Sequence, residues 1–150
     1  MRKRTAQPTR AGQLTGTQLQ IVTIHNDGLR ESITLANQGT LAQPMCGWVL
    51  ATLRGERFYF FPDDVVMLPE MMVTIHSGQD ALDAPPRDLL WAREQMWNNR
   101  GDVAVLFDSN GLEVDRYTYP HKRILGSAAQ HRKQLVRDSG TWWMVDELRT

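Results

Sequence analysis

The sequence predicts an all-β sandwich of two antiparallel sheets. Turn-forming residues recur about every 8 to 12 residues, a spacing typical of short strands that follow one another. No long stretch repeats its apolar residues at the helical period of about 3.6, which argues against an α/β fold. The 150 residues are 41% hydrophobic, enough for one domain to bury a core without disulfides or structural metals.

The first predicted strand covers residues 31–36, where apolar and polar side chains alternate. Ile33 and Leu35 share one face, as in a strand buried on one side only. Asn37 then begins a turn, because asparagine readily adopts turn conformations. The apolar run after this turn predicts a second strand over residues 45–51.

Two further runs predict strands in the middle of the chain, over residues 58–61 and 65–78. The segment 78–87 that follows is long for a connection in a sandwich, and its two prolines cannot take part in a regular strand. Such loops often carry binding residues, and they also tolerate insertions. The candidate partner-binding residues in and after this loop are Arg87, Trp91 and Arg93.

A β-hairpin is expected near residue 110. Val103, Val105 and Phe107 fall on one face of an extended segment. Asn110 and Gly111 follow, and this pair typically forms a tight primed turn because both residues tolerate positive φ.

The return strand of this hairpin requires an irregularity. Leu112 and Val114 share one parity along the chain, whereas Tyr117 and Tyr119 share the other. If all four side chains face inward, a bulge must lie between Val114 and Tyr117.

Several of these segments together resemble the lamin-tail domain, an immunoglobulin-like module. In chain order they are Asn37-x-Gly39, Gly47-Trp48-x-Leu50, Phe61-Pro62, Leu68-Pro69 and Trp97-Asn98-Asn99-x-Gly101-Asp102. The resemblance extends over residues 20–119 and implies an immunoglobulin-like β-sandwich. It also implies a non-catalytic module that tethers other chains, and sometimes nucleic acid, to an assembly.

Glu70 departs from the family pattern, in which glycine usually follows the Leu-Pro pair. A non-glycine residue at this position predicts that Glu70 avoids positive φ, and therefore that no type II turn places it there.

Charge is distributed unevenly along the chain, although the net charge is zero. Residues 1–19 carry four basic side chains and no acidic one. Residues 20–119 carry 7 basic and 14 acidic side chains, a net charge of −7. Residues 120–150 carry 6 basic and 3 acidic side chains, a net charge of +3. We therefore expect a flexible basic N-terminal segment, a domain and a C-terminal extension with these bounds.

Two interpretations of the basic ends remain open. They could bind phosphate backbones or an acidic protein surface, an attraction that salt would weaken. Alternatively, they are solvated termini that fold back loosely on the acidic domain or simply keep the protein soluble. The candidate nucleic-acid-binding residues are Arg2, Lys3, Arg4, Arg10, Lys122, Arg123, Arg132, Lys133 and Arg137.

The C-terminal extension predicts a helix followed by an apolar segment. Apolar residues from Ile124 to Val136 fit one side of a helix, and Gly140 would end it. Trp142 and Trp143 come next. These indoles either pack on the sandwich as an added strand or form a docking surface for a partner chain.

The residue types that most often carry out catalysis form no recognisable set. We interpret His76 as an exposed strand residue and Cys46 as a small buried side chain without a partner base. Neither a phosphate-binding glycine loop nor a nucleophile elbow is present. None of the histidines has metal-ligand spacing to another histidine or to Cys46: His25, His76, His121 and His131.

Four carboxylates flank the predicted hairpin: Asp102, Asp108, Glu113 and Asp115. Their spacing partly matches a calcium loop, but the flanking segments are extended and not helical, which favours a plain turn. Asp102 is expected to accept backbone hydrogen bonds in the loop after Gly101.

We therefore expect a non-catalytic protein-interaction or scaffolding module with no cofactor and no metal site. A protein partner or self-association is expected, with Trp142 and Trp143 as the leading candidate residues. The single cysteine and the absence of an apolar leader or membrane-length segment predict a cytoplasmic protein that does not bind membranes. The alternatives are nucleic-acid binding through the basic ends and, more remotely, a metal-dependent hydrolase.

Overall fold

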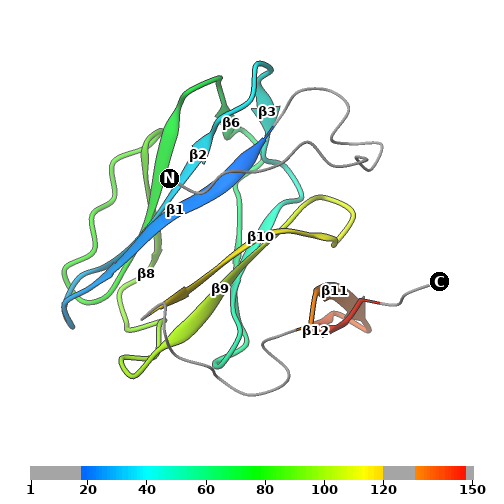
Figure 1. Ribbon diagram of the computed structural model, residues 1–150. Coiled ribbons are helices and arrows are strands. Elements are labelled where there is room, and N and C mark those ends of the chain that lie inside the picture. The colour runs from blue at the N-terminus through cyan, green and yellow to red at the C-terminus, as the bar shows by residue number, and fades with distance from the viewer. Residues whose placement is uncertain (1–17, 120–130, 148–150) are drawn as a thin grey trace.

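The computed structural model describes residues 18–119 and 131–147, which form twelve β-strands and no helix (Figure 1). One sheet has the strand order β1 (Leu19–Asn26), β2 (Glu31–Asn37), β7 (Met72–Ser77) and β8 (Asp88–Ala92). The second has the order β10 (Glu113–Tyr119), β9 (Asp102–Phe107), β4 (Val49–Thr52) and β5 (Arg57–Phe60). Two-stranded ribbons are formed by β3 (Gln43–Pro44) with β6 (Val66–Met67), and by β11 (Lys133–Asp138) with β12 (Thr141–Asp146).

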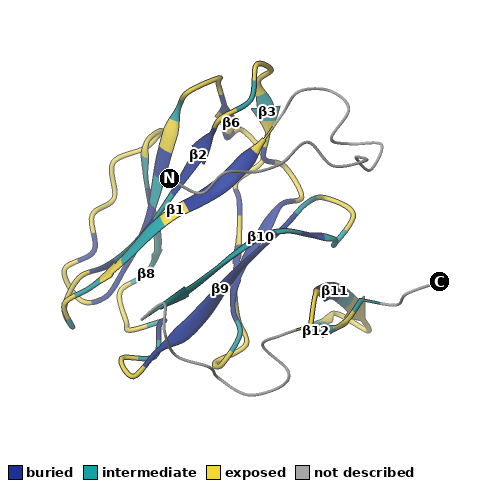
Figure 2. Ribbon diagram, viewed as in Figure 1, coloured by how far each residue is buried: buried dark blue, intermediate teal, exposed yellow. Residues whose placement is uncertain are grey.

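The two four-stranded sheets form a sandwich, as the sequence predicts. Neighbouring strands are antiparallel except β7 and β8, which are parallel. Ile33 and Leu35 are fully buried, with the half-buried side chains of Ser32 and Thr34 on the opposite face of β2. Across the core, Leu50 of β4 and Leu106 of β9 face them in one cluster of buried side chains. Figure 2 shows this burial along β1, β2 and β9.

A buried carboxylate joins the two sheets where β1 lies beside β10. Asp115 Oδ2 accepts a hydrogen bond from the amide of Ile21 at 2.8 Å. Both strands are irregular there, because the pairing register shifts between Ile21 and Thr23 in β1. In β10 the register shifts between Glu113 and Asp115. The expected bulge is therefore present but begins earlier than predicted, and it accompanies two buried carboxylates.

The β9–β10 turn is not the primed turn that the sequence predicts. Gly111 has a φ of 77°, but Asn110 does not have a positive φ. The amide of Gly111 donates to the carbonyl of Asp108 at 2.9 Å, and Asp108 Oδ1 accepts from the amides of Asn110 and Leu112. These contacts fit a three-residue loop with glycine in the left-handed position, stabilised by the Asp108 side chain.

The expectation for Glu70 is wrong, because this residue has a φ of 66°. The amide of Met71 donates to the carbonyl of Leu68 at 3.0 Å, which closes a turn with Pro69 and Glu70 at its centre. Proline followed by a residue at positive φ is the pattern of a type II turn. The amide of Glu70 donates to the carbonyl of Asn37 at 2.8 Å, so the neighbouring loop fixes the strained residue.

The expected helix between residues 124 and 136 is also wrong over its described part, since β11 begins at Lys133. Residues 120–130 lie outside the described part of the chain. Ser139 and Gly140 both have positive φ, at 51° and 82°, between the paired residues Asp138 and Thr141. A two-residue loop with these dihedrals is a primed hairpin turn. Gly140 therefore turns a hairpin and does not end a helix.

The hairpin β11–β12 forms a third layer over the outer face of the second sheet (Figure 1). Because both faces of that sheet are covered, all six residues of β9 are buried. Within the described residues, no helix is long and apolar enough to cross a lipid bilayer.

Candidate interaction surface

One side of the C-terminal hairpin packs on the sandwich. Leu135, Trp142 and Met144 join an apolar cluster on the outer face of the second sheet. The Trp142 ring lies 5.2 Å from the ring of Phe60, centroid to centroid. The Arg137 guanidinium lies 5.4 Å from the centroid of Trp142, a cation–π distance. Trp142 therefore contributes to the fold.

The other side of the hairpin carries Trp143. Side chains alternate along a strand, so Trp143 and Val145 project from the face opposite Trp142 and Met144. Val136 pairs directly with Trp143 across the hairpin. All three side chains are half-buried, and together they form an apolar surface that we call the Trp143 face. The sequence could not separate the two tryptophans, because their roles depend on the register of β12.

Glu113 attaches the hairpin to the sandwich. Its buried carboxylate accepts from Arg116 Nε and Nη2 at 2.8 Å each, and from the amide of Lys133 at 2.8 Å. The amide of Leu135 donates to the carbonyl of Gly111 at 2.8 Å, beside this ion pair. Gly111 is needed for this approach, because a Cβ there would lie 2.7 Å from the Leu135 oxygen.

The described basic candidates make contacts within the chain. Lys133 Nζ lies 2.6 Å from Asp146 Oδ1, and this hydrogen bond lowers the pKa of Asp146. Arg132 Nε lies 3.2 Å from a carboxylate oxygen of Glu147, and Arg137 stacks on Trp142 as described. Six candidates lie outside the described residues: Arg2, Lys3, Arg4, Arg10, Lys122 and Arg123.

The structure does not bring the three loop candidates into one site. Trp91 is half-buried in the core, with its ring 5.7 Å from Trp97 and 5.8 Å from Tyr59. Arg93 is exposed, and its Nη1 donates to the carbonyl of Ala81 at 2.8 Å. Arg87 is exposed immediately before β8, and its carbonyl accepts from the amide of Thr74.

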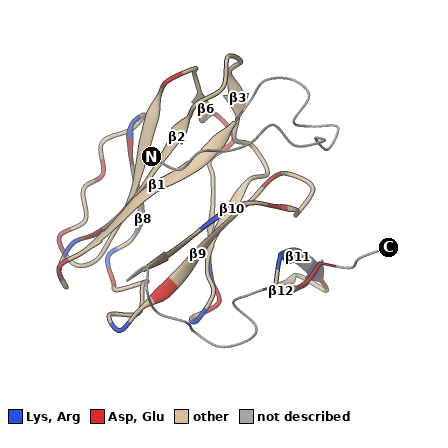
Figure 3. Cartoon of the chain, viewed as in Figure 1, with Lys and Arg blue, Asp and Glu red and all other residues tan. Residues whose placement is uncertain are grey.

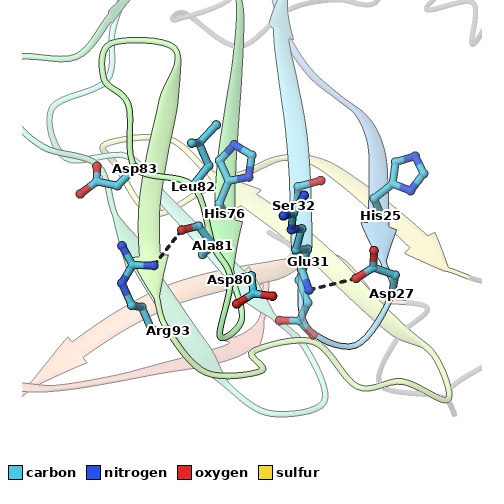
Figure 4. A pocket seen from close by; sticks show the side chains of 11 residues that line it. His25, Asp27, Glu31, Ser32, His76, Asp80, Ala81, Leu82, Asp83 and Arg93 are labelled. Carbon is cyan, nitrogen blue, oxygen red and sulfur yellow. Dashed lines mark hydrogen bonds between the residues drawn. The ribbon is translucent and has the colours of Figure 1, made fainter.

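A polar hollow of about 560 Å³ lies beside this loop (Figure 4). His25, Ser32 and His76 line it from three neighbouring strands. His76 Nε2 lies 2.8 Å from Asp88 Oδ1, so this side chain joins β7 to β8. His76 is half-buried, so the prediction of an exposed strand residue is wrong.

The four carboxylates near the β9–β10 hairpin have separate structural tasks. Asp102 Oδ1 accepts from the amides of Arg54 and Val103, and its Oδ2 accepts from that of Asn98, which confirms the predicted role. Burial raises the pKa of Asp102, and this effect outweighs the three backbone donors. Across residues 18–119 and 131–147, no three His, Cys, Asp or Glu side chains are grouped to hold a metal ion.

A further buried carboxylate, Glu31, was missed by the sequence analysis. It accepts from Ser77 Oγ at 2.8 Å and from the amide of Met96 at 2.7 Å, fixing the segment before β9. Its position two residues before Ile33, on the same strand face, was a signal for its burial. Cys46 was expected to be buried but is exposed, and a hydrogen bond to Asp63 at 3.3 Å raises the pKa of its thiol.

The sequence and the structure agree with one known family. The family model of the Lamin Tail Domain matches residues 13–121, which is 109 of the 150 residues. The match includes both four-stranded sheets of the immunoglobulin-like sandwich. This chain belongs to the lamin-tail-domain family.

Proposed function

We propose that this chain is a non-catalytic protein-interaction module that acts in the cytoplasm, and that the Trp143 face is its contact surface. The single observation that carries the proposal is that the two adjacent tryptophans lie on opposite faces of the hairpin. Trp142 packs on the second sheet, whereas Trp143 projects away from the sandwich beside Val136 and Val145.

A surface of this kind suits a protein partner. Tryptophan is enriched among the residues that dominate binding energies, because it buries a large apolar area with few rotatable bonds. The strands beneath Trp143 are held by six cross-strand residue pairs and by the Glu113 contacts. Such support keeps the side chain in position and reduces the entropy lost on binding.

The test compares the full chain with its Trp143→Ala variant. Sedimentation velocity over a wide concentration range measures self-association, and chemical crosslinking followed by mass spectrometry identifies partner chains. We expect Trp143→Ala to weaken association at least about tenfold while lowering the free energy of unfolding by less than about 1 kcal/mol. Equal association by both proteins, with the same crosslinked partners, would overturn the proposal.

A second candidate function is nucleic-acid binding through the basic ends of the chain. The observation that favours it is the charge of residues 1–19, four basic side chains and no acidic one. The basic residues of the described C-terminal hairpin already have partners within the chain. This function would therefore depend mainly on the candidates outside the described residues: Arg2, Lys3, Arg4, Arg10, Lys122 and Arg123.

Fluorescence anisotropy of a labelled DNA duplex tests this candidate. Binding should fade steeply as salt rises, and replacing the four N-terminal basic residues with glutamine should weaken it strongly. Replacing Arg30, Arg54, Arg87 and Arg100 with glutamine is the matched control. No binding by the full chain at low salt would remove the candidate.

A further inference from the structure

An exposed apolar patch lies at the end of the sandwich that carries the ribbon β3–β6. Leu41, Val66, Leu68 and Met72 are 45%, 40%, 56% and 50% exposed. Isolated exposed apolar side chains are common and need no explanation, but a group in one place often marks a binding surface. We call these four residues the end patch.

Hydrogen bonds of Asn37 hold the loops of the end patch together. Its Nδ2 donates to the carbonyl of Leu41 at 2.8 Å and to that of Met67 at 2.9 Å. Met67 lies between the exposed Val66 and Leu68, so the loop with Leu41 is fixed against this strand. Asn37 is fully buried and anchors a surface that is ordered before any partner binds.

Among the described residues, the charge around the end patch has one sign. Asp63, Asp64 and Glu70 are exposed within the segments that carry the patch. Residues 36–53 and 58–72 contain these three acidic side chains and no lysine or arginine. Figure 3 shows acidic and no basic segments beside β3 and β6. An apolar surface with an acidic rim therefore lies apart from the basic residues of the domain.

We propose that the end patch binds a basic, leucine-containing peptide segment of a second protein. The apolar side chains of that segment would cover Leu68 and its neighbours, and its lysines or arginines would pair with the acidic rim. Two copies of this chain would not pair through the same patch, because their acidic rims would repel each other. The Trp143 face lies on another part of the molecule, so each proposal can fail without the other.

Binding of a defined peptide tests this proposal. The probe is a fluorescein-labelled peptide of lysines interspersed with leucines, and the matched probe has glutamate in place of lysine. Anisotropy with the full chain should show binding of the basic probe only, weaker at physiological salt than at low salt. Leu68→Ser, and separately the triple variant Asp63→Asn, Asp64→Asn and Glu70→Asn, should each weaken binding at least about tenfold. Asparagine suits position 70 because it tolerates positive φ.

The controls make equivalent changes at the other end of the sandwich. They are Leu82→Ser, which is 50% exposed, and the triple variant Glu56→Asn, Asp80→Asn and Asp83→Asn. Unchanged binding by both controls supports the proposal. Equal losses in controls and test variants would show a non-specific attraction to an acidic protein and overturn it.

A competition arm examines the N-terminal segment of this chain as the occupant. A free peptide of residues 1–17 is added to the complex of the full chain with the basic probe. Failure to displace the probe supports a second protein as the source. Displacement that Leu68→Ser abolishes would assign the patch to the N-terminal segment of this chain and overturn the proposal.

Discussion

Asp102 shows how single buried carboxylates organise the loops of this domain. Its two oxygens bind three backbone amides from two different loops and from its own strand. Glu31 does the same for the segment that contains Met96. These side chains replace backbone partners that irregular segments cannot supply, which explains why acidic residues occupy the interior.

Asp102 also makes stability depend on pH. Burial raises its pKa above the usual 3.8, so the folded protein holds this proton at a higher pH than the unfolded chain. The resulting stabilisation is complete below about pH 3.8 and is lost as the pH rises through the raised value. We therefore expect the free energy of unfolding of the wild type, relative to Asp102→Asn, to fall across this window. Urea titrations at several pH values measure it, and a constant difference would contradict the assignment.

Glu70 is strained by its φ of 66°. Left-handed backbone costs a non-glycine residue about 1–2 kcal/mol, and glycine removes this cost while adding entropy to the unfolded chain. Glu70→Gly should therefore raise the free energy of unfolding by about 0.5–1 kcal/mol. Glu70→Val, which adds a β-branch at the same φ, should lower it in the same urea titration. Destabilisation by glycine would show that the Glu70 side chain compensates for its own strain.

At the level of elements, the sequence predicts most of the sandwich but not its third layer. Ile33 and Leu35 mark a strand because they alternate with polar side chains, as expected for a strand that is buried on one face. Leu135 and Val136 mislead because they fit the apolar side of a helix, whereas they lie in β11 of a hairpin that covers a sheet. Primed-turn residues were recognised at Asn110-Gly111, but such a turn occurs at Ser139-Gly140. In both cases the outcome depends on how neighbouring strands pair, which the residue pattern alone does not show.

The two faces of the C-terminal hairpin were harder to predict than the sandwich for the same reason. The sequence identifies Trp142 and Trp143 as unusual but cannot assign them to opposite faces, since a shift of one residue in β12 would exchange them. It also cannot show that Arg132 and Lys133 have partners within the chain, because those partners lie across the hairpin.

Trp142 should account for much of the stability of the third layer. Trp142→Ala removes the contacts with Phe60 and Arg137 and exposes the apolar sheet beneath. We expect a loss of about 2–3 kcal/mol, somewhat below the value for a fully buried aromatic residue. Trp143→Ala should cost less than about 1 kcal/mol. Denaturant unfolding of both variants measures the difference. Equal losses would contradict the assignment of Trp142 to the packed face and Trp143 to the outer face.

Glu113 should determine whether the hairpin stays attached. Glu113→Gln removes the charge that Arg116 and the amide of Lys133 contact, at an expected cost of about 1–3 kcal/mol. Hydrogen exchange at the amide of Leu135 should accelerate, because it bonds to Gly111 across the same junction. Glu94→Gln is the control, since that side chain is 65% exposed and its pair with Arg57 should contribute less than about 1 kcal/mol. An unchanged exchange rate at the amide of Leu135 in Glu113→Gln would contradict the role of Glu113 in attaching the hairpin.

At the level of the whole molecule, the two sheets are joined by packing and by Asp115. This carboxylate on β10 accepts from the amide of Ile21 on β1, across the open side of the sandwich. Asp115→Ala leaves that buried amide without its acceptor, so we expect a loss of about 1–3 kcal/mol. The amide of Ile21 should also exchange faster. Asp80→Ala, at an exposed position, is the control for the urea titration, and equal stability of the two variants would contradict this role.

The third layer is synthesised later than the sheet that it covers. The apolar face of the second sheet is built from residues 49–107, whereas the strands that cover it lie at residues 133–146. Translation proceeds at about 5–20 residues per second, so the nascent sandwich exposes this face for a period on the order of seconds. During biosynthesis, a molecular chaperone that binds apolar sheet surface would therefore act on this face in the interval before β11 and β12 leave the ribosome.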